Sequence, residues 1–154
     1  MAYENQNRPF GQRPSGNNQN RWNNTPSEAE RFFNENLFKG EWITNEVTRE
    51  TITYVENAGK FMKEKGLSSS QIRNVYGEMK RIEMKGYEDE KSAFFLLKPK
   101  VAYALGRDSK NQGLKLFQLI FNKAWGCVSN EKTYKNFCNL FEAIIAFHKS
   151  YGGK

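Results

Sequence analysis

Apolar side chains recur at intervals of three and four residues from residue 28 to the end of the chain, whereas residues 1–27 contain only scattered ones. This spacing places the apolar side chains on one face of an α-helix. Residues 28–154 also contain a single proline, Pro99, among helix-forming residues. The pattern therefore predicts an all-α fold, a compact bundle of five or six helices.

Capping residues and glycines mark the ends of these predicted helices. Ser27 with Glu30 and Ser68 with Gln71 have the spacing of a capping box, which begins a helix. The predicted helices cover residues 28 to about 40, about 44 to 65, 69 to 86, about 88 to 105, about 114 to 125 and about 131 to 148. Pro99 lies inside the fourth helix and cannot donate a backbone hydrogen bond, so we expect a kink or short break near Lys98.

Residues 1–27 have a different composition from the rest of the chain. They contain seven Asn, three Gln, three Arg and three of the four prolines. Such a segment buries too little apolar surface to offset the entropy lost on ordering. We therefore expect two regions, a disordered Asn/Gln-rich leader over residues 1–27 and a helical domain over residues 28–154.

The charge balance indicates the class of partner. Lys and Arg number 24 and Asp and Glu 17, giving a net charge of +7, which favours nucleic acid first and an anionic membrane surface second. The net charge is −4 over residues 28–56 but +4 over residues 60–85 and +4 over residues 98–115. No apolar run is long enough to span a bilayer, and two cysteines are too few for a disulfide framework, so we expect a cytoplasmic protein without a membrane segment.

Few residues in the chain are suited to catalysis or metal binding. His148 is the single histidine, and Cys127 and Cys138 are eleven residues apart without a CxxC motif. A structural zinc site needs more ligands of this kind, and no glycine-rich nucleotide-binding loop occurs. We therefore expect no enzymatic activity, no cofactor and no metal.

Two basic groups are the candidates for a nucleic-acid site. On the helix that begins at Ser69, a step of 100° per residue places the first group in one sector opposite the apolar face. The second group surrounds Pro99 and the following turn, and Tyr103 is the aromatic residue best placed to stack. His148 either packs in the core or faces RNA, and the cations either contact phosphates or simply face solvent. The candidate RNA-binding residues are Arg73, Asn74, Lys80, Arg81, Lys85, Lys98, Lys100, Tyr103, Arg107 and His148.

Three blocks of sequence carry a resemblance to a known family. They are residues 67–74 (LSSSQIRN), 97–107 (LKPKVAYALGR) and 137–149 (FCNLFEAIIAFHK). Together they resemble the small α-helical subunit of the type III-A CRISPR effector, the Csm complex, over about residues 44–152.

The resemblance implies a non-catalytic RNA-binding subunit in antiviral defence. In that family several copies stack head to tail beside the backbone subunits and help to hold guide RNA and target RNA, so the implied partners are both RNAs, other copies of the chain, the backbone subunits and the large polymerase-like subunit. The residues that fall on the family's blocks are Arg73, Asn74, Lys98, Lys100, Tyr103 and Arg107; the remaining candidates come from the helical-face argument. A helical adaptor that binds acidic proteins, with incidental nucleic-acid binding, is the alternative.

Overall fold

The computed structural model describes residues 25–154, and all regular secondary structure in that part of the chain is helical. The elements are α1 (Glu28–Glu35), α2 (Glu41–Thr44), α3 (Arg49–Glu64), α4 (Ser69–Lys85), the 3-10 turn η1 (Tyr87–Asp89), α5 (Lys91–Arg107), α6 (Gln112–Trp125) and α7 (Glu131–Ser150). The prediction of an all-α fold is confirmed. The predicted leader lies outside the described residues except for its last three positions.

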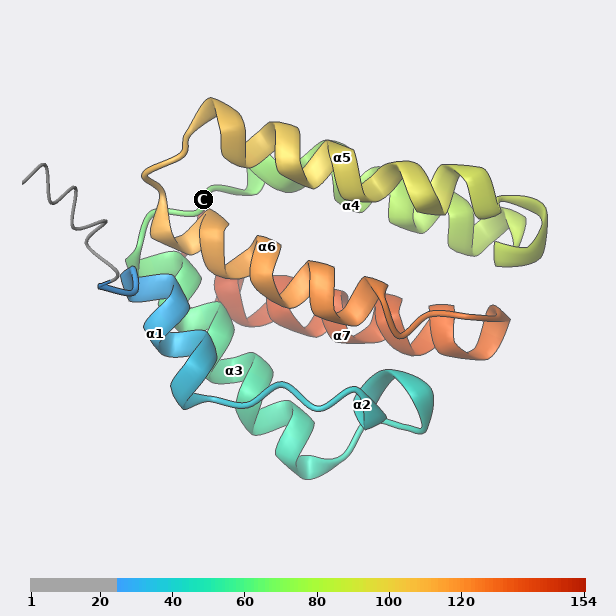
Figure 1. Ribbon diagram of the computed structural model, residues 1–154, viewed down its shortest axis with the longest axis horizontal. Coiled ribbons are helices and arrows are strands. Elements are labelled where there is room, and N and C mark those ends of the chain that lie inside the picture. The colour runs from blue at the N-terminus through green and yellow to red at the C-terminus, as the bar shows by residue number, and fades with distance from the viewer. Residues whose placement is uncertain (1–24) are drawn as a thin grey trace, which may run out of the picture.

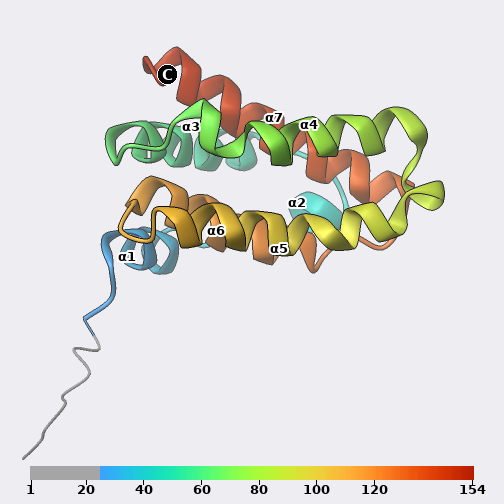
Figure 2. The same cartoon turned by 90° about the horizontal axis from the view of Figure 1, so that it is seen from above.

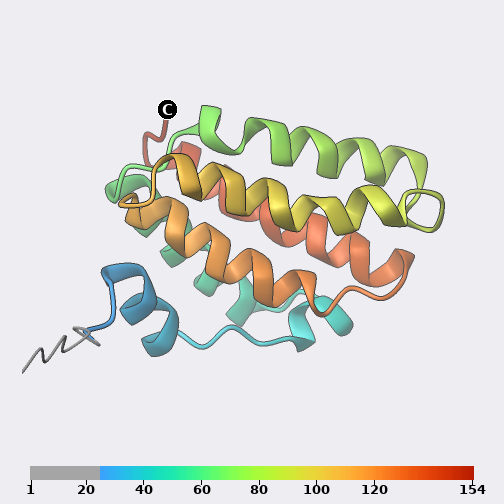
Figure 3. The same ribbon diagram turned by 45° about the horizontal axis from the view of Figure 1, so that its top comes forward.

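The helices pack in antiparallel neighbours around α6 and α7. Helices α4 and α5 form a hairpin along one side of the molecule, and α1, α2 and α3 lie on the other side (Figure 1). Seen from above, α4 and α5 run next to each other over their whole length (Figure 2). A third view shows α4, α5 and α6 as successive rows with α7 behind them (Figure 3). The hairpin therefore presents one long surface to solvent.

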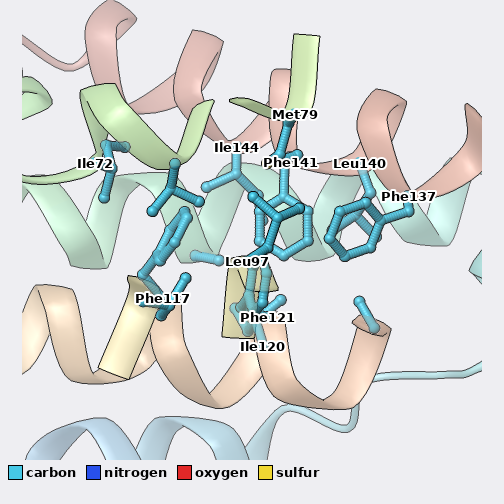
Figure 4. Close-up of a cluster of buried hydrophobic side chains, with 14 of the residues drawn as sticks. Ile72, Met79, Leu97, Phe117, Ile120, Phe121, Phe137, Leu140, Phe141 and Ile144 are labelled. Carbon is cyan, nitrogen blue, oxygen red and sulfur yellow. The ribbon is translucent and has the colours of Figure 1, made fainter. Parts of the chain in front are cut away.

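The core fills the space between this hairpin and the central helices. Side chains from α4, α5, α6 and α7 meet there, as Figure 4 shows for Met79, Leu97, Phe121 and Phe141. Phe137 and Phe141 lie 4.9 Å apart between ring centroids, and Phe121 is 5.5 Å from Phe141. Burial of large aromatic rings is the main contribution to such a core, and it holds α4 and α5 in place.

The N-terminal part contains more and shorter helices than predicted. Helix α1 ends at Glu35 because the Asn36 backbone and side chain both donate to the carbonyl of Phe32. Helix α3 begins only at Arg49, after a capping box between Thr48 and Thr51. One-turn α2 lies between them, which gives seven α-helices in the described residues.

Some residues expected to face inward are exposed in this region. The exposed fractions of Leu37, Val47 and Ile52 are 74%, 37% and 42%. The first two lie in non-helical segments, where the periodicity of a helix does not determine the direction of a side chain. The sequence pattern predicted that Val47 and Ile52 face inward on a single helix, and that prediction was wrong.

The sequence predicted a kink or short break near Lys98, and no break occurs there. Helix α5 runs without interruption from Lys91 to Arg107 with Pro99 inside it. Pro99 has no N–H to donate to the carbonyl of Phe95. Both residues are exposed, so water can donate a hydrogen bond to that carbonyl instead. Phe95 was predicted to be buried with Phe94, but it is 53% exposed whereas Phe94 is 1% exposed.

Candidate nucleic-acid interface

A groove between α4 and α5 joins Asn74 of α4 with Lys100, Tyr103 and Arg107 of α5. Its volume is about 1090 Å³, which is similar to that of the largest small-molecule sites. The lining residues are Ser70, Gln71, Asn74, Val75, Glu78, Leu96, Pro99, Lys100, Tyr103, Ala104, Arg107 and Asp108. Four of the ten candidate residues are among them, although more than twenty positions separate those on α4 from those on α5 in the sequence.

Hydrogen bonds fix the end of the groove where α4 begins. The side-chain oxygen of Gln71 accepts from the backbone N–H of Ser68 at 2.9 Å, which is half of the predicted capping box. The Gln71 amide nitrogen donates to Asp108 at 2.8 Å, across from α4 to the end of α5. Asn111 donates to the same carboxylate at 3.0 Å. These contacts hold the two helix ends, and hence the groove, in one arrangement.

Glu78 lies in the middle of the groove and is surrounded by cations. Arg81 donates to both of its carboxylate oxygens, at 3.3 and 3.2 Å, and Lys100 lies 3.7 Å away. The hydrogen bond from Arg81 and the positive charge of Lys100 lower the pKa of the Glu78 carboxyl. Glu78 therefore stays ionised and neutralises part of the positive charge that the sequence places here.

The basic sector predicted on α4 is divided by such ion pairs. Lys80 faces α7, 3.5 Å from Glu142 and 3.7 Å from Glu83. Arg81 faces the other way and pairs with Glu90, just before α5, at 3.2 Å as well as with Glu78. Helical periodicity placed these cations in one sector but did not identify the carboxylates that approach from other elements.

Four other candidates remain available to an external anion. All four are exposed, and no carboxylate in residues 25–154 lies within ion-pair distance of them; they are Arg73, Lys85, Lys98 and Arg107. The Arg107 guanidinium instead lies 5.9 Å from the ring centroid of Tyr103, which is 68% exposed. Contact with an aromatic face leaves the charge of an arginine intact.

Lys98 lies on a different flank of α5 from Lys100. Its ammonium group is 4.9 Å from the ring centroid of Trp125 on α6. Lys100 approaches Glu78 on α4. The second basic group of the sequence is thus divided between the groove and the side of α5 that faces α6.

His148 packs in the core, which is one of the two alternatives that the sequence left open for it. Its side chain is 1% exposed, and its Nε2–H donates to the carbonyl of Leu67 at 2.6 Å. Gly153 packs against the imidazole, and the Lys154 carbonyl accepts from Ser69 N–H at 2.6 Å. The prediction that His148 contacts RNA was wrong, because the ring lies inside the protein and joins the end of α7 to the start of α4.

Sequence reasoning missed the apolar and acidic parts of the groove. Leu96, Glu78 and Asp108 line it but were not candidates. One signal was present for Leu96: the consecutive apolar residues 93–97 point to all sides of a helix, and one inward face cannot bury them all. No spacing rule indicated the acidic residues, whose positions depend on the pairing of α4 with α5.

The described residues hold no group of three or more metal-ligating side chains and no helix long and apolar enough to cross a membrane. Both cysteines in the chain are free thiols. Burial raises the pKa of the Cys138 thiol to about 12. Cys138 is therefore a packing residue of α7.

Comparison with known proteins identifies the family. A family model described as Csm2 Type III-A matches residues 45–154, which include helices α3 to α7 and the whole groove but not α1 and α2. Comparisons with curated proteins and with solved structures give no match. The resemblance that the sequence suggested is thus confirmed, and the chain belongs to the Csm2 type III-A family of structural small subunits of the type III-A CRISPR effector complex.

Proposed function

We propose that the chain is a cytoplasmic, non-catalytic subunit that holds the guide–target RNA duplex through sequence-independent backbone contacts in antiviral defence. The observation that carries this proposal is the packing of α4, which bears Arg73 and Lys85, beside α5, which bears Lys98, Lys100 and Arg107 (Figure 2). The proposed contacts are Arg73, Asn74, Lys85, Lys98, Lys100, Tyr103 and Arg107. His148 is not included because it is buried.

The proposed contacts differ in how much charge they offer to RNA. Arg73 and Arg107 have no carboxylate partner in the described residues, so their full charge is available to phosphate oxygens. Phosphate contacts of this kind fix position on the duplex but do not distinguish bases. A double-stranded RNA is recognised mostly by its A-form shape and its backbone.

The salt dependence of RNA binding tests this function. If about four phosphates are neutralised, log K should fall against log salt with a slope of about −3 to −4. Arg73→Ala with Arg107→Ala should make this slope shallower by about 2. The matched control is Arg49→Ala, an exposed arginine at the start of α3 on the far side of the molecule (Figure 1).

A second double variant separates free cations from paired ones. Lys80→Ala with Arg81→Ala should change the slope little, because both side chains already pair with carboxylates. The proposed surface is contradicted if the Lys80 and Arg81 double variant makes the salt slope shallower and the Arg73 and Arg107 double variant does not. Absence of salt-dependent binding in the wild-type chain contradicts the function itself.

Two exposed patches of unlike charge support the proposal that copies of the chain stack head to tail. The first, called the acidic patch after its segment of net charge −4, contains the exposed apolar side chains Leu37, Val47 and Ile52. The basic patch consists of Phe95, Lys98 and Trp125, on the flank of α5 next to α6. The segments around α2 and the start of α3 lie on the opposite side of the molecule from α5 (Figure 1), so contact between the two patches joins unlike surfaces and repeats along a row.

Mixing two variants tests the head-to-tail arrangement. Leu37→Asp and Phe95→Asp each damage one patch and leave the other intact, so each variant alone should stay monomeric in analytical ultracentrifugation after nuclease treatment. Their mixture should form dimers that grow no further, since only one intact contact remains. Met84→Asp is the control, because Met84 is 88% exposed and lies outside both patches. A mixture without dimers contradicts the arrangement, and nuclease-resistant assemblies that bind no RNA favour the adaptor function.

A further inference from the structure

The lining of the α4–α5 groove is poorly suited to a phosphate chain alone. Lys100 and Arg107 contribute two positive charges, and Glu78 and Asp108 contribute two negative ones. The lining of the groove is therefore neutral in sum, and Arg107 is its one cation without a carboxylate partner in residues 25–154. A group that enters the groove from RNA should itself be neutral, which describes a base or a ribose but not a phosphate.

The floor of the groove is apolar and can accept a flat ring. Val75, Leu96, Pro99 and Ala104 contribute the apolar surface of its lining. Leu96 is 58% exposed, although a leucine gains free energy when it is buried. The volume of about 1090 Å³ exceeds that of most ligand sites and leaves room for a nucleoside.

Tyr103 offers a stacking surface at the side of this floor. Its side chain is 68% exposed on an ordered helix. Arg107, one turn further along α5, lies 5.9 Å from the ring centroid and restricts the ring on that side. An aromatic ring beside cations is the combination with which proteins bind unpaired nucleotides, because the base stacks and the phosphate meets the cation.

Asn74 supplies a polar group that no other residue uses. It is exposed on α4 and lines the groove opposite α5, and its side-chain amide has no hydrogen-bond partner in residues 25–154. The neighbouring amide of Gln71 is engaged by Ser68 and Asp108. An amide offers both a donor and an acceptor, which a base edge or a ribose hydroxyl can satisfy.

We propose that the α4–α5 groove binds an unpaired nucleobase of RNA, stacked on Tyr103, with Asn74 at the polar edge of the nucleoside and Arg107 at the adjoining phosphate. The inference rests on the proposed function, since it assigns one specific contact within the RNA surface. It adds a preference for an unpaired nucleotide to the proposed backbone contacts with the duplex.

Fluorescence anisotropy with three RNA ligands tests the inference. The ligands are a blunt duplex, the same duplex with a short unpaired adenine tail, and the same tail without bases. The full chain should bind the adenine tail more tightly than the other two. Tyr103→Ala should weaken binding of the adenine-tailed duplex roughly 5- to 100-fold, the usual effect of losing one stacking ring, and should leave the blunt duplex nearly unaffected.

Two further variants separate stacking from other effects. Tyr103→Phe keeps the ring and should keep the preference for the adenine tail. Tyr151→Ala removes another partly exposed tyrosine, whose hydroxyl donates to Glu56 away from the groove, and should also keep the preference. Because Tyr103 is mostly exposed, Tyr103→Ala should unfold at the wild-type temperature, which circular dichroism checks.

Failure of the inference is distinct from failure of the proposed function. Equal affinity for the adenine tail and the tail without bases, together with salt-dependent binding of the blunt duplex, overturns the inference and leaves backbone binding intact. An equal loss for blunt and tailed duplexes in Tyr103→Ala also overturns it. A chain that binds the adenine tail but not the blunt duplex contradicts duplex binding and supports the inference.

Discussion

The crossing of α3 and α7 depends on the absence of a side chain at Gly59. A Cβ atom at this position would lie 2.9 Å from the carbonyl oxygen of Ile144, 2.9 Å from the Cβ of Phe147 and 3.0 Å from the backbone nitrogen of His148. These distances are shorter than van der Waals contact, and two of the three atoms belong to the backbone of α7. Gly59→Ala should therefore push the two helices apart.

The expected magnitude is the difference between two opposing effects. Alanine is favoured over glycine inside a helix by about 1 kcal/mol. Overpacking typically costs about 1–3 kcal/mol, and the upper part of that range applies because backbone atoms cannot rotate away. Gly59→Ala should therefore lower the free energy of unfolding by about 1–2 kcal/mol.

Gly77 provides a matched control on α4. It also lies inside a helix, but a Cβ atom there would have no neighbour within 4 Å. Gly77→Ala should raise the free energy of unfolding by about 0.5–1 kcal/mol. Since both variants gain the same helix propensity, the difference of about 2–3 kcal/mol between them measures the cost of separating α3 from α7.

Urea unfolding followed by circular dichroism measures this difference. The two midpoints should move in opposite directions from that of the wild type, with unchanged m-values. If Gly59→Ala stabilises the protein as much as Gly77→Ala does, α3 and α7 are not in close contact at this position and the reasoning is refuted. A changed m-value in Gly59→Ala indicates an altered native state instead of a simple loss of stability.

Two further predictions concern buried side chains. At pH 8 a thiol reagent should modify Cys127 and not Cys138 in the native protein, and both after unfolding. The pKa of the Cys138 thiol rises to about 12 in the folded protein, whereas the pKa of an unfolded thiol is near 9. The contribution of the neutral Cys138 thiol to stability is therefore complete below about pH 9 and is lost as the pH rises toward 12. His148→Ala should lower the free energy of unfolding by about 2–4 kcal/mol, because it creates a cavity and leaves the buried carbonyl of Leu67 without its donor, but RNA affinity measured on the folded protein should not change.

The features predicted best from the sequence are those that depend on a few consecutive residues. Ser27 accepts from the backbone of Glu30 at 3.2 Å, as the capping-box spacing predicted. Gly66 and Gly86 follow α3 and α4 with φ angles of 94° and 99°, in the region that glycine reaches most easily. Local hydrogen bonding and steric limits are encoded in such short segments, so they can be recognised without the tertiary structure.

The candidate site was predicted less completely because it depends on contacts between elements. The periodicity of α4 correctly placed Lys80 and Arg81 on its surface, but Glu142 and Glu90 approach them from other parts of the chain. A helical wheel describes the direction of a side chain and not the charge that faces it. Asn74 and Arg107 were found because each lies in a recognisable basic block, yet only the hairpin of α4 and α5 places them at one groove.

Helix α5 connects the folding pattern with the proposed interactions. Phe94, Leu97 and Val101 form its buried face, but Phe95 and Tyr103 are more than half exposed on its other sides. A helix with apolar residues all around is normally buried on all sides, whereas α5 lies on the surface of the bundle, between α4 and α6 and in front of α7 (Figure 3). The exposed aromatic residues therefore contribute little to folding of the single chain, and the proposed interactions would bury them: the base proposed for Tyr103 and the second copy proposed for Phe95 account for the two flanks separately.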